Sequence, residues 1–236
     1  MRSRRPLQPV IERLPYAGLL VAGLLLLAWL LMAEPFRVRQ VTITGLRYLP
    51  RGQVDLALGA QGQSVFLLNR QQLRRAVQRL GPVAEAGVQI GLPARLTVTI
   101  SERPPAYRWQ SGGTAYLVSA DGVVLAPARE PGDLPLVVDR DGRPLAVGEH
   151  LDPQVLRAVD FLTRALPQYT ALSSPQYEYS RAEGLAVSSD GRRIVFGLDD
   201  LLTKVLTLRV LDESLRARGL RPTLIDLRFA DHPYIR

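Results

Sequence analysis

Histidine and cysteine, which are common in metal sites and in nucleophilic catalysis, are scarce in this chain of 236 residues. The chain contains two histidines, His150 and His232, and no cysteine. The histidines lie far apart and outside any His-Glu-x-x-His motif, and no carboxylates group with them to complete a zinc site. We interpret His150, which follows Glu149 in a predicted turn, as a surface residue. The sequence predicts no metal site and no cofactor.

Three segments approach the motifs of nucleophilic or phosphate-binding sites, and each lacks a residue that its motif requires. Two residues after Ser64, Phe66 occupies the position at which a nucleophile elbow needs glycine. The only lysine, Lys204, is preceded three positions earlier by Leu201, where a Ser-x-x-Lys site needs serine. Residues 191–197 have the length of a phosphate-binding loop, but no lysine follows them directly.

The adjacent carboxylates of Asp199 and Asp200 are the remaining candidates for general acid–base work. Both precede a segment with apolar residues at helical spacing, where an aspartate also serves as the N-cap. We favour this structural interpretation. The sequence therefore predicts no catalytic residue and a protein that is not an enzyme.

The first half of the chain beyond residue 36 alternates between short strands and amphipathic helices. Its apolar spacing predicts the order strand, helix, helix, strand, strand over residues 38–44, 50–58, 70–80, 83–90 and 96–100. Gly45 closes the first strand, and Asn69 is the expected N-cap of the second helix. This order indicates a small α+β unit.

The prolines at positions 104 and 105 mark a boundary, because proline cannot continue a central strand. Beyond them the pattern is mainly that of β-structure. Turn signals predict two hairpins, a separate strand and a last strand near the chain end, over residues 116–125, 185–196, 136–138 and 223–229.

Two predicted helices interrupt these strands. One begins at Asp152, with proline in its first turn, and ends before Pro167. The other begins at Asp199 or Asp200 and ends at Gly219. The second half of the chain is therefore expected to be a β domain with two helices.

From Leu14 to Ala33 the chain runs for twenty residues without a charged side chain. A helix of that length spans about the 30 Å of a hydrocarbon core, and Trp29 near its end fits an aromatic belt. The preceding thirteen residues carry four arginines and one glutamate, so we expect them in the cytoplasm and the rest outside. A cleaved signal peptide is the alternative, although Leu31-Met32-Ala33 lacks the first small residue of such a cleavage site.

The formal net charge is +8, and no basic block is interleaved with aromatic residues. This distribution is typical of a solvated surface and does not favour nucleic-acid binding. Because the chain has no cysteine, its outer domains are expected to be held together by packing and not by disulfides.

The α+β unit contains four blocks with a recognisable pattern, residues 41–45, 62–69, 82–88 and 92–109, the last of which ends in Glu-Arg-Pro-Pro-Ala-Tyr-Arg-Trp. These blocks resemble the POTRA domain of the FtsQ and DivIB family of bacterial cell-division proteins. The family often has tryptophan after the proline of the third block and before the proline of the fourth. Here no tryptophan follows Pro82, and Leu92 precedes Pro93. These are apolar packing positions, so the departures leave the implied role unchanged.

Two blocks of the second half resemble the β domain of the same family. Residues 116–124 are similar to its first hairpin, and residues 225–229, Ile-Asp-Leu-Arg-Phe, are similar to its C-terminal strand. The Leu-Pro-x-x-x-Gly element usual between them is incomplete, because Asp139 stands where the glycine is expected. The order of anchor, POTRA domain and β domain resembles the family over essentially the whole chain.

Together the residue patterns and the resemblance predict a membrane-anchored α+β protein. Residues 1–13 would form a cytoplasmic basic head, 14–33 a transmembrane helix, 34–104 a POTRA domain and 105–236 an extracytoplasmic β domain. We expect a single-pass protein of the cell (inner) membrane at the division septum, with an anchor that contains Leu14, Trp29 and Ala33.

The resemblance implies a non-enzymatic scaffold of the divisome, which recruits division proteins and links early and late components through its outer domains. It also implies that the POTRA domain and the anchor meet other divisome proteins. It implies no cofactor, no small-molecule substrate and no nucleic acid. One alternative is a POTRA-bearing factor for outer-membrane assembly or transport, although no array of amphipathic strands sufficient for a barrel follows. The other is a membrane-tethered hydrolase with an unrecognised site.

The last predicted strand has two interpretations. It is an ordinary edge strand with Ile225, Leu227 and Phe229 in the core, or it is an unprotected edge that accepts a strand from a partner. In the family this strand receives a segment of FtsB, which forms a coiled coil with FtsL, so the resemblance favours partner binding. It implies contacts at Asp226, Leu227, Arg228, Phe229, Asp231 and Tyr234.

Overall fold

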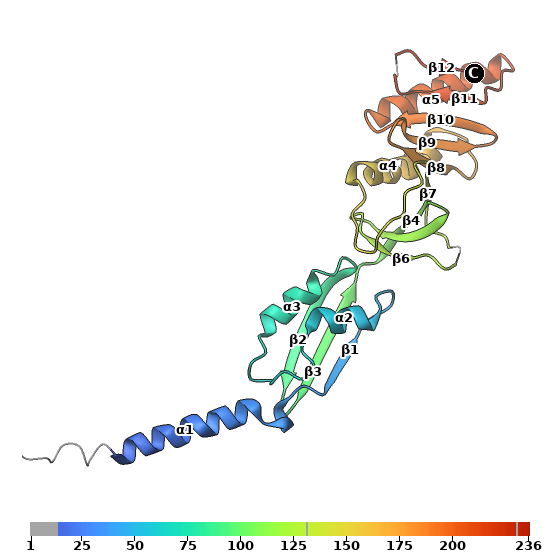
Figure 1. Ribbon diagram of the computed structural model, residues 1–236. Helices are drawn as coiled ribbons and strands as arrows, with labels where there is room; N and C mark the ends of the chain where they lie inside the picture. The colour runs from blue at the N-terminus through green and yellow to red at the C-terminus, as the bar shows by residue number, and fades with distance from the viewer. Residues whose placement is uncertain (1–13, 131, 230) are drawn as a thin grey trace, which may run out of the picture. The chain divides into compact units, whose positions relative to one another are not determined.

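The computed structural model describes residues 14–130, 132–229 and 231–236 (Figure 1). These residues form two compact units. The described residues of the first unit are 14–46, 50–79 and 85–101, and the second unit takes up the remainder of the described chain.

The first unit begins with helix α1, Leu14–Met32, followed by a 3-10 helix, η2, Glu34–Phe36. Helix α1 contains no charged residue, and the side chain of Trp29 in its last third is exposed. Leu14 begins the helix and Ala33 follows its end. Within the described part of the chain, no helix reaches the combination of length and apolarity that crossing a membrane requires. The predicted cytoplasmic head, residues 1–13, lies outside the described residues.

A three-stranded sheet and two helices form the rest of the first unit, in the predicted order strand, helix, helix, strand, strand. The elements are β1, Gln40–Thr44; α2, Arg51–Leu58; α3, Arg70–Gln78; β2, Val83–Gly91; and β3, Arg95–Glu102. Strand β3 lies between β1 and β2 and runs parallel to β1. Its inward residues are buried and alternate with residues that reach solvent, as half-buried strands do. The 3-10 helix is the only helix here that the sequence pattern did not predict.

Local signals in the sequence account for the ends of these elements. The Asn69 side chain accepts hydrogen bonds from the N–H groups of Gln71 and Gln72, so it is the N-cap of α3, as predicted. Gly45 follows β1 with φ of 89°, and a Cβ atom there would lie 1.9 Å from the carbonyl oxygen of Ile100. Only glycine fits this position, because the backbone of β3 passes directly beside it.

The second unit is a mixed nine-stranded sheet with two helices. Its strands are β4, Pro105–Ser111; β5, Thr114–Ser119; β6, Val124–Pro127; β7, Leu136–Asp139; β8, Gln176–Ser180; β9, Gly184–Ser189; β10, Arg192–Gly197; β11, Leu224–Asp226; and β12, Tyr234–Ile235. Their order across the sheet is β12-β11-β10-β9-β8-β7-β4-β5-β6. Helices α4, Pro153–Tyr169, and α5, Leu201–Ala217, interrupt the strands.

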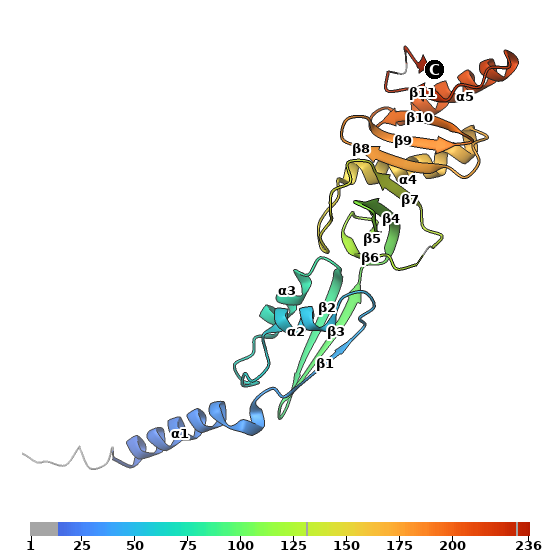
Figure 2. The ribbon, with the colours of Figure 1, turned by 45° about the vertical axis from the view of Figure 1, so that its right-hand side comes forward.

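Both helices of the second unit cover the same face of its sheet (Figure 1, Figure 2). Buried residues of α4, such as Leu162, and of α5, such as Leu208, form one core with every second residue of the central strands. In β10 these inward residues are Ile194 and Phe196. The outward residues of the same strands, which include Arg193, face away from the helices. The sheet therefore has one apolar, helix-covered face and one open face.

The two predicted hairpins are present as β5–β6 and β9–β10, both antiparallel. In the second hairpin Asp190 and Gly191 have φ of 53° and 74°. Two consecutive residues with positive φ are typical of the type I′ turn that an Asp-Gly pair favours. Strands β4, β8 and β12 were not predicted.

Two helix ends differ from the predictions. Helix α4 begins after Asp152 as predicted, with the aspartate accepting a hydrogen bond from Gln154, but it continues through Pro167 to Tyr169. The last turn persists because Leu166 is buried and its carbonyl oxygen accepts the N–H of Thr170. At the start of α5, Asp200 occupies the N-cap position in a left-handed conformation and makes no side-chain capping bond.

Candidate partner-binding site

The chain's own C-terminus covers the edge of β11, for which the interpretation favoured by the family resemblance expected an unprotected edge. Strand β11 pairs with β10 on one side and with β12 on the other. Leu224 and Arg236 exchange two backbone hydrogen bonds of 3.0 Å each, and Ile225 lies opposite Ile235. The predicted strand over residues 223–229 was thus too long, and the prediction of its free edge was wrong. A turn after Phe229, in which the N–H of His232 donates to the carbonyl oxygen of Phe229, brings the chain back.

Strand β12 is therefore the terminal strand on this side of the sheet. In an antiparallel pair, residues alternate between those bonded to the neighbouring strand and those whose N–H and C=O point away from it. Because Arg236 is bonded to Leu224, the N–H and C=O of Ile235 point outward. Pro233, at the preceding outward position, contributes a carbonyl oxygen but no donor.

The six residues predicted to contact a partner have different environments. Leu227 is fully buried in the core of the second unit and its side chain is not available to a partner. Asp226 and Arg228 form an ion pair of 2.7 Å, and Asp226 also accepts the backbone N–H of Arg228. Both are partly buried, so they support this corner of the sheet as well as facing solvent.

Phe229, Asp231 and Tyr234 are the exposed members of the predicted set. Phe229 is 73% exposed, which excludes the alternative that it packs in the core beside Leu227. Tyr234 is 59% exposed and lies opposite Asp226 in the ladder. Two aromatic side chains and the outward backbone groups of Ile235 thus share the C-terminal part of the sheet.

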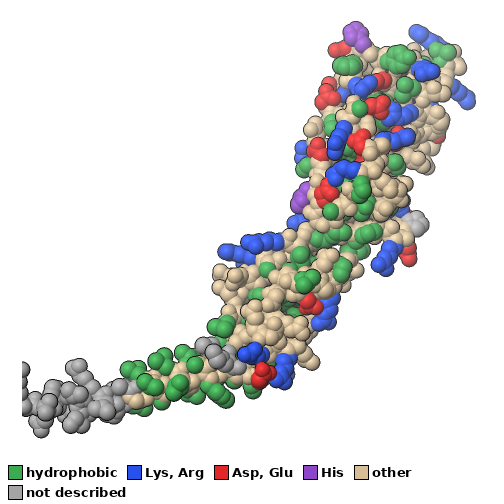
Figure 3. Space-filling model, viewed as in Figure 1, with side chains coloured by type: hydrophobic (Ala, Val, Ile, Leu, Met, Phe, Trp, Pro, Cys, Tyr) green, Lys and Arg blue, Asp and Glu red, His purple; other side chains and the backbone are tan. Residues whose placement is uncertain are grey.

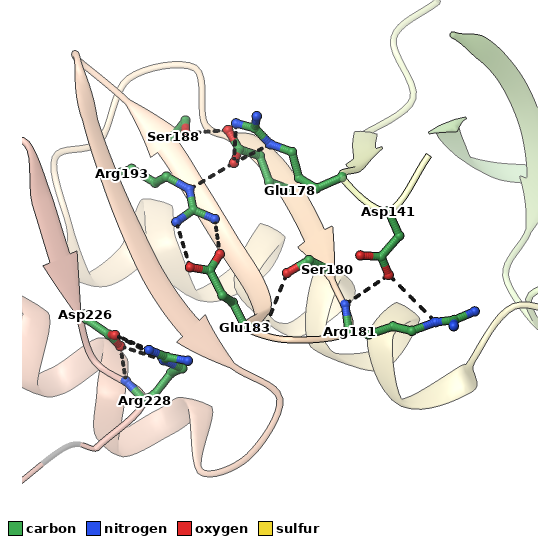
Figure 4. A network of polar contacts seen from close by, with 10 residues as sticks. Asp141, Glu178, Ser180, Arg181, Glu183, Ser188, Arg193, Asp226 and Arg228 are labelled. Carbon is green, nitrogen blue, oxygen red and sulfur yellow. Dashed lines mark hydrogen bonds and ion pairs between the residues drawn. The ribbon is translucent and has the colours of Figure 1, made fainter. Parts of the chain in front are cut away.

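An arginine–carboxylate network covers the open face of the sheet beside this corner (Figure 4). Its centre is Glu178 of β8, whose carboxylate accepts hydrogen bonds from Ser188, Arg140 and Arg193 at 2.7 to 3.1 Å. Arg193 also pairs with Glu183 at 2.5 Å. Glu178 is 7% exposed, so the two guanidinium groups compensate a carboxylate that has little access to water.

The network lowers the pKa values of its carboxyl groups. Burial alone raises the pKa of Glu178, but hydrogen bonds from Ser188, Arg193 and Arg140 outweigh this effect and hold the pKa below its usual range. Hydrogen bonds from Arg193 lower the pKa of Glu183. Those from Arg228 do the same for Asp226. These groups are therefore charged and fully paired near neutral pH, which is typical of structural ion pairs.

Sequence reasoning did not identify this network, because its members come from strands β8, β9 and β10 and from loops, and their pairing depends on how these segments meet in space. The period-2 geometry of a strand was a usable signal, since it places Arg193 on the face of β10 opposite the core-facing Ile194. The signal did not reveal the partner carboxylate. Strand β8, which carries Glu178, was itself missed.

The other residues weighed for chemistry are dispersed or structurally engaged. Lys204 is buried, and its ammonium group lies 2.7 Å from a carboxylate oxygen of Asp199. The hydrogen bond from Lys204 lowers the pKa of Asp199, so this aspartate bonds to a lysine side chain and not to the N-terminus of α5. Among the described residues, no three histidine, cysteine or carboxylate side chains come together in a way that would hold a metal ion.

Comparison with known proteins assigns both units to one family. Residues 36–103 match the family model of the POTRA domain, FtsQ-type. Residues 107–228 match the model of the cell division protein FtsQ/DivIB, C-terminal. The second match ends two residues after Asp226, so it includes β11 but not β12.

Individual relatives agree with the family models. The chain is 29% identical over 199 residues to the cell division protein FtsQ of Chloroflexus aggregans, which covers 83% of this chain and 73% of that protein. It is 30% identical over 244 residues to the FtsQ of Anaeromyxobacter sp. (strain K), covering 96% of this chain and 80% of that protein. The POTRA unit and the mainly β unit that follows it each match a model of this family. This chain therefore belongs to the FtsQ/DivIB family of cell division proteins.

Proposed function

We propose that this protein is a non-enzymatic scaffold of the division machinery, which holds other division proteins at the septum. The observation that carries the proposal is the outer edge of β12, where the backbone N–H and C=O of Ile235 point away from β11 and the neighbouring Tyr234 is exposed. An edge of this kind binds an extended partner segment as an added strand, with backbone hydrogen bonds for affinity and side-chain contacts for selection. Family membership supports a role in division.

The partner that we propose for this edge is the FtsB–FtsL pair, as the family resemblance implies. A strand from FtsB would pair with Ile235, while Phe229 and Tyr234 would pack against its side chains. Asp231 and Arg228 would contribute charge at the periphery, with Asp226 holding Arg228 in place. This assignment moves the binding edge from the predicted strand at residues 223–229 to β12.

The proposal includes a membrane anchor at residues 14–33 and a cytoplasmic head at residues 1–13. The absence of charge from α1 and the exposure of its leucine side chains from Leu19 to Leu27 support it. We also propose domain boundaries at 34–104 for the POTRA domain and 105–236 for the β domain, which agree with the matched residues 36–103 and 107–228.

Substitutions at Ile235 test strand addition directly. Ile235→Pro removes the outward N–H and leaves the bonds between Leu224 and Arg236 intact. A carbonyl oxygen of the partner strand then loses its donor, while β12 stays paired with β11. Ile235→Val keeps that N–H and is the matched control. With full-length protein in detergent, we expect the proline variant to lose binding of the FtsB–FtsL pair and the valine variant to keep it.

The aromatic side chains are tested by Phe229→Ala combined with Tyr234→Ala. Central aromatic anchors typically contribute more than about 2 kcal/mol, so affinity for the pair is expected to fall at least about thirtyfold. Val210→Ala, another exposed apolar position in the second unit, is the control. Melting is recorded on the same samples. A double variant that is folded and binds with wild-type affinity would exclude this edge from recruitment.

Depletion in cells separates the division role from the alternatives. A scaffold of the division machinery predicts long filamentous cells without septa. Outer-membrane defects in cells that still divide would instead indicate an assembly or transport factor, and hydrolytic activity of the purified protein would indicate an enzyme.

A further inference from the structure

The first unit has a groove of about 660 Å³ between α2 and α3. Leucine side chains at positions 58, 67, 68 and 73 line it, together with the arginines at 75 and 79 and several glutamine and asparagine side chains. Leu58 and Leu73 are buried in the domain core, whereas Leu67 is 66% exposed. The groove thus has an apolar base that continues into an exposed leucine, and a polar rim.

The charge around this groove has one sign. From residue 56 to residue 84 the chain contains four arginines and no aspartate, glutamate or lysine. Three of the arginines lie in α3, and Arg79 follows its end. Within the part of the chain that the structure describes, none of these four guanidinium groups forms an ion pair or a side-chain hydrogen bond. Figure 3 shows blue Lys and Arg side chains gathered on the side of the first unit where α3 lies.

The arginines around this groove differ from those on the open face of the second unit's sheet. In the second unit Arg140, Arg193 and Arg228 all pair with carboxylates. The arginines of α3 repel one another and have no local counter-charge, so an external anion would stabilise them. Because Arg75 and Arg79 line the same groove as the leucine side chains, the best complement has apolar and acidic side chains on one segment.

We propose that this groove binds an acidic amphipathic helix of a partner protein. Helix-in-groove recognition places apolar residues at helical spacing against an apolar base, while charged residues of the helix meet the rim. A concave site that contains both leucine and arginine side chains favours a protein segment over a flat membrane surface, because a flat surface would contact all four arginines of this region equally. The proposal rests on the scaffold function proposed above and adds a second recruitment surface, separate in sequence from the β12 edge.

The test uses full-length protein in nanodiscs of neutral phosphatidylcholine and a fluorescent helical peptide of about 14 residues, with leucine at helical spacing and glutamate elsewhere. A peptide with lysine in place of glutamate is the control probe. We expect the glutamate peptide to bind and the lysine peptide not to bind. Equal binding of the two peptides would overturn the proposal.

Two pairs of variants locate the contact. Arg75→Glu with Arg79→Glu changes the groove rim, whereas Arg70→Glu with Arg74→Glu makes the same change in charge on α3 outside the groove. We expect the first pair to weaken peptide binding at least about tenfold and the second at most about threefold. The reason is that arginines in direct contact with the peptide contribute more to its affinity than arginines that attract it only over a distance through water. Leu67→Ser is expected to weaken binding, and Leu56→Ser, an exposed position outside the groove, is its control. The proposal would be overturned if the two double variants lost the same amount of peptide affinity, or if Leu67→Ser and Leu56→Ser did.

Two further measurements separate this proposal from others. If nanodiscs containing phosphatidylglycerol abolish peptide binding, lipid headgroups occupy the site and the protein partner is excluded. The FtsB–FtsL pair is titrated on the same samples. Normal binding of that pair to the Arg75→Glu, Arg79→Glu variant is expected, so failure of the groove and failure of the β12 edge give different results.

Discussion

Glu178 shows how a single residue supports the open face of the second sheet. Its carboxylate bonds to Arg140, Arg193 and Ser188, which come from three different segments of the chain. Replacement of any one donor leaves two others, whereas loss of the carboxylate charge leaves both guanidinium groups without their shared partner. The loss of stability is therefore expected to be larger when the Glu178 carboxylate is replaced than when one of its donors is replaced.

We expect Glu178→Gln to lower the free energy of unfolding of the second unit by about 2 kcal/mol, the cost of hydrogen bonds to a charged group. Glu183→Gln is the matched control, because that side chain is 37% exposed and water can replace the lost bonds. Urea unfolding of full-length protein, followed by the fluorescence of buried Trp109 after Trp29→Phe, measures the difference. Equal effects of the two substitutions would contradict the structural role of Glu178.

The lowered pKa of Glu178 also predicts a pH dependence. A carboxyl group whose pKa is lower in the folded state contributes stability that is complete above its unfolded-state pKa, about 4.3 for glutamate. This contribution is lost as pH falls through the lower folded-state pKa. We expect the free energy of unfolding to decrease with acidification below about pH 4.3, and to decrease less steeply in Glu178→Gln. Urea titrations at a series of pH values test this, and parallel curves would exclude a role for Glu178.

At the scale of elements, β3 organises the first unit. It lies between β1 and β2, and its residues Leu96, Val98 and Ile100 face the core. Thr97 and Thr99 alternate with them and reach solvent. A charged side chain in this strand is therefore expected to disrupt folding at the buried positions and to be tolerated at the exposed positions between them.

We expect Val98→Asp to abolish the cooperative folding of the first unit, because a carboxylate at a fully buried position costs several kcal/mol unless it is neutralised. Thr99→Asp places the same group on the exposed face of the next residue and is expected to leave the unit folded. Hydrogen exchange of the first unit's amides in the full-length protein measures both. Strong protection in Val98→Asp would show that this face is not the core.

For the whole molecule, the proposed topology predicts where proteases can act. With the head in the cytoplasm, a protease added to intact spheroplasts is expected to digest residues 34–236 and to spare residues 1–13, because short basic segments resist translocation. Blotting with tags at each end measures this. Recovery of a free protein that begins near Glu34 would indicate a cleaved signal peptide instead of an anchor.

The sequence by itself determined the elements whose signals are local. Asn69 and Asp152 begin their helices as predicted, and the Asp-Gly pair at 190 and 191 forms the expected hairpin turn. A cap or a turn depends on residues a few positions apart, so the chain's own pattern is sufficient. The same holds for the strand, helix, helix, strand, strand order and for the family resemblance, which the family models confirm.

Only the tertiary structure decided what covers each surface. The periodicity of residues 225–229 was the same whether Phe229 was buried or exposed, and the early end of β11 left Leu227 in the core and Phe229 in solvent. Covering of the β11 edge by β12, and pairing of Glu178 with arginines from other segments, depend on chain segments meeting in space. Such contacts leave no periodic mark in the sequence, because backbone pairing is independent of side-chain type and one exposed arginine resembles another until its partner is known.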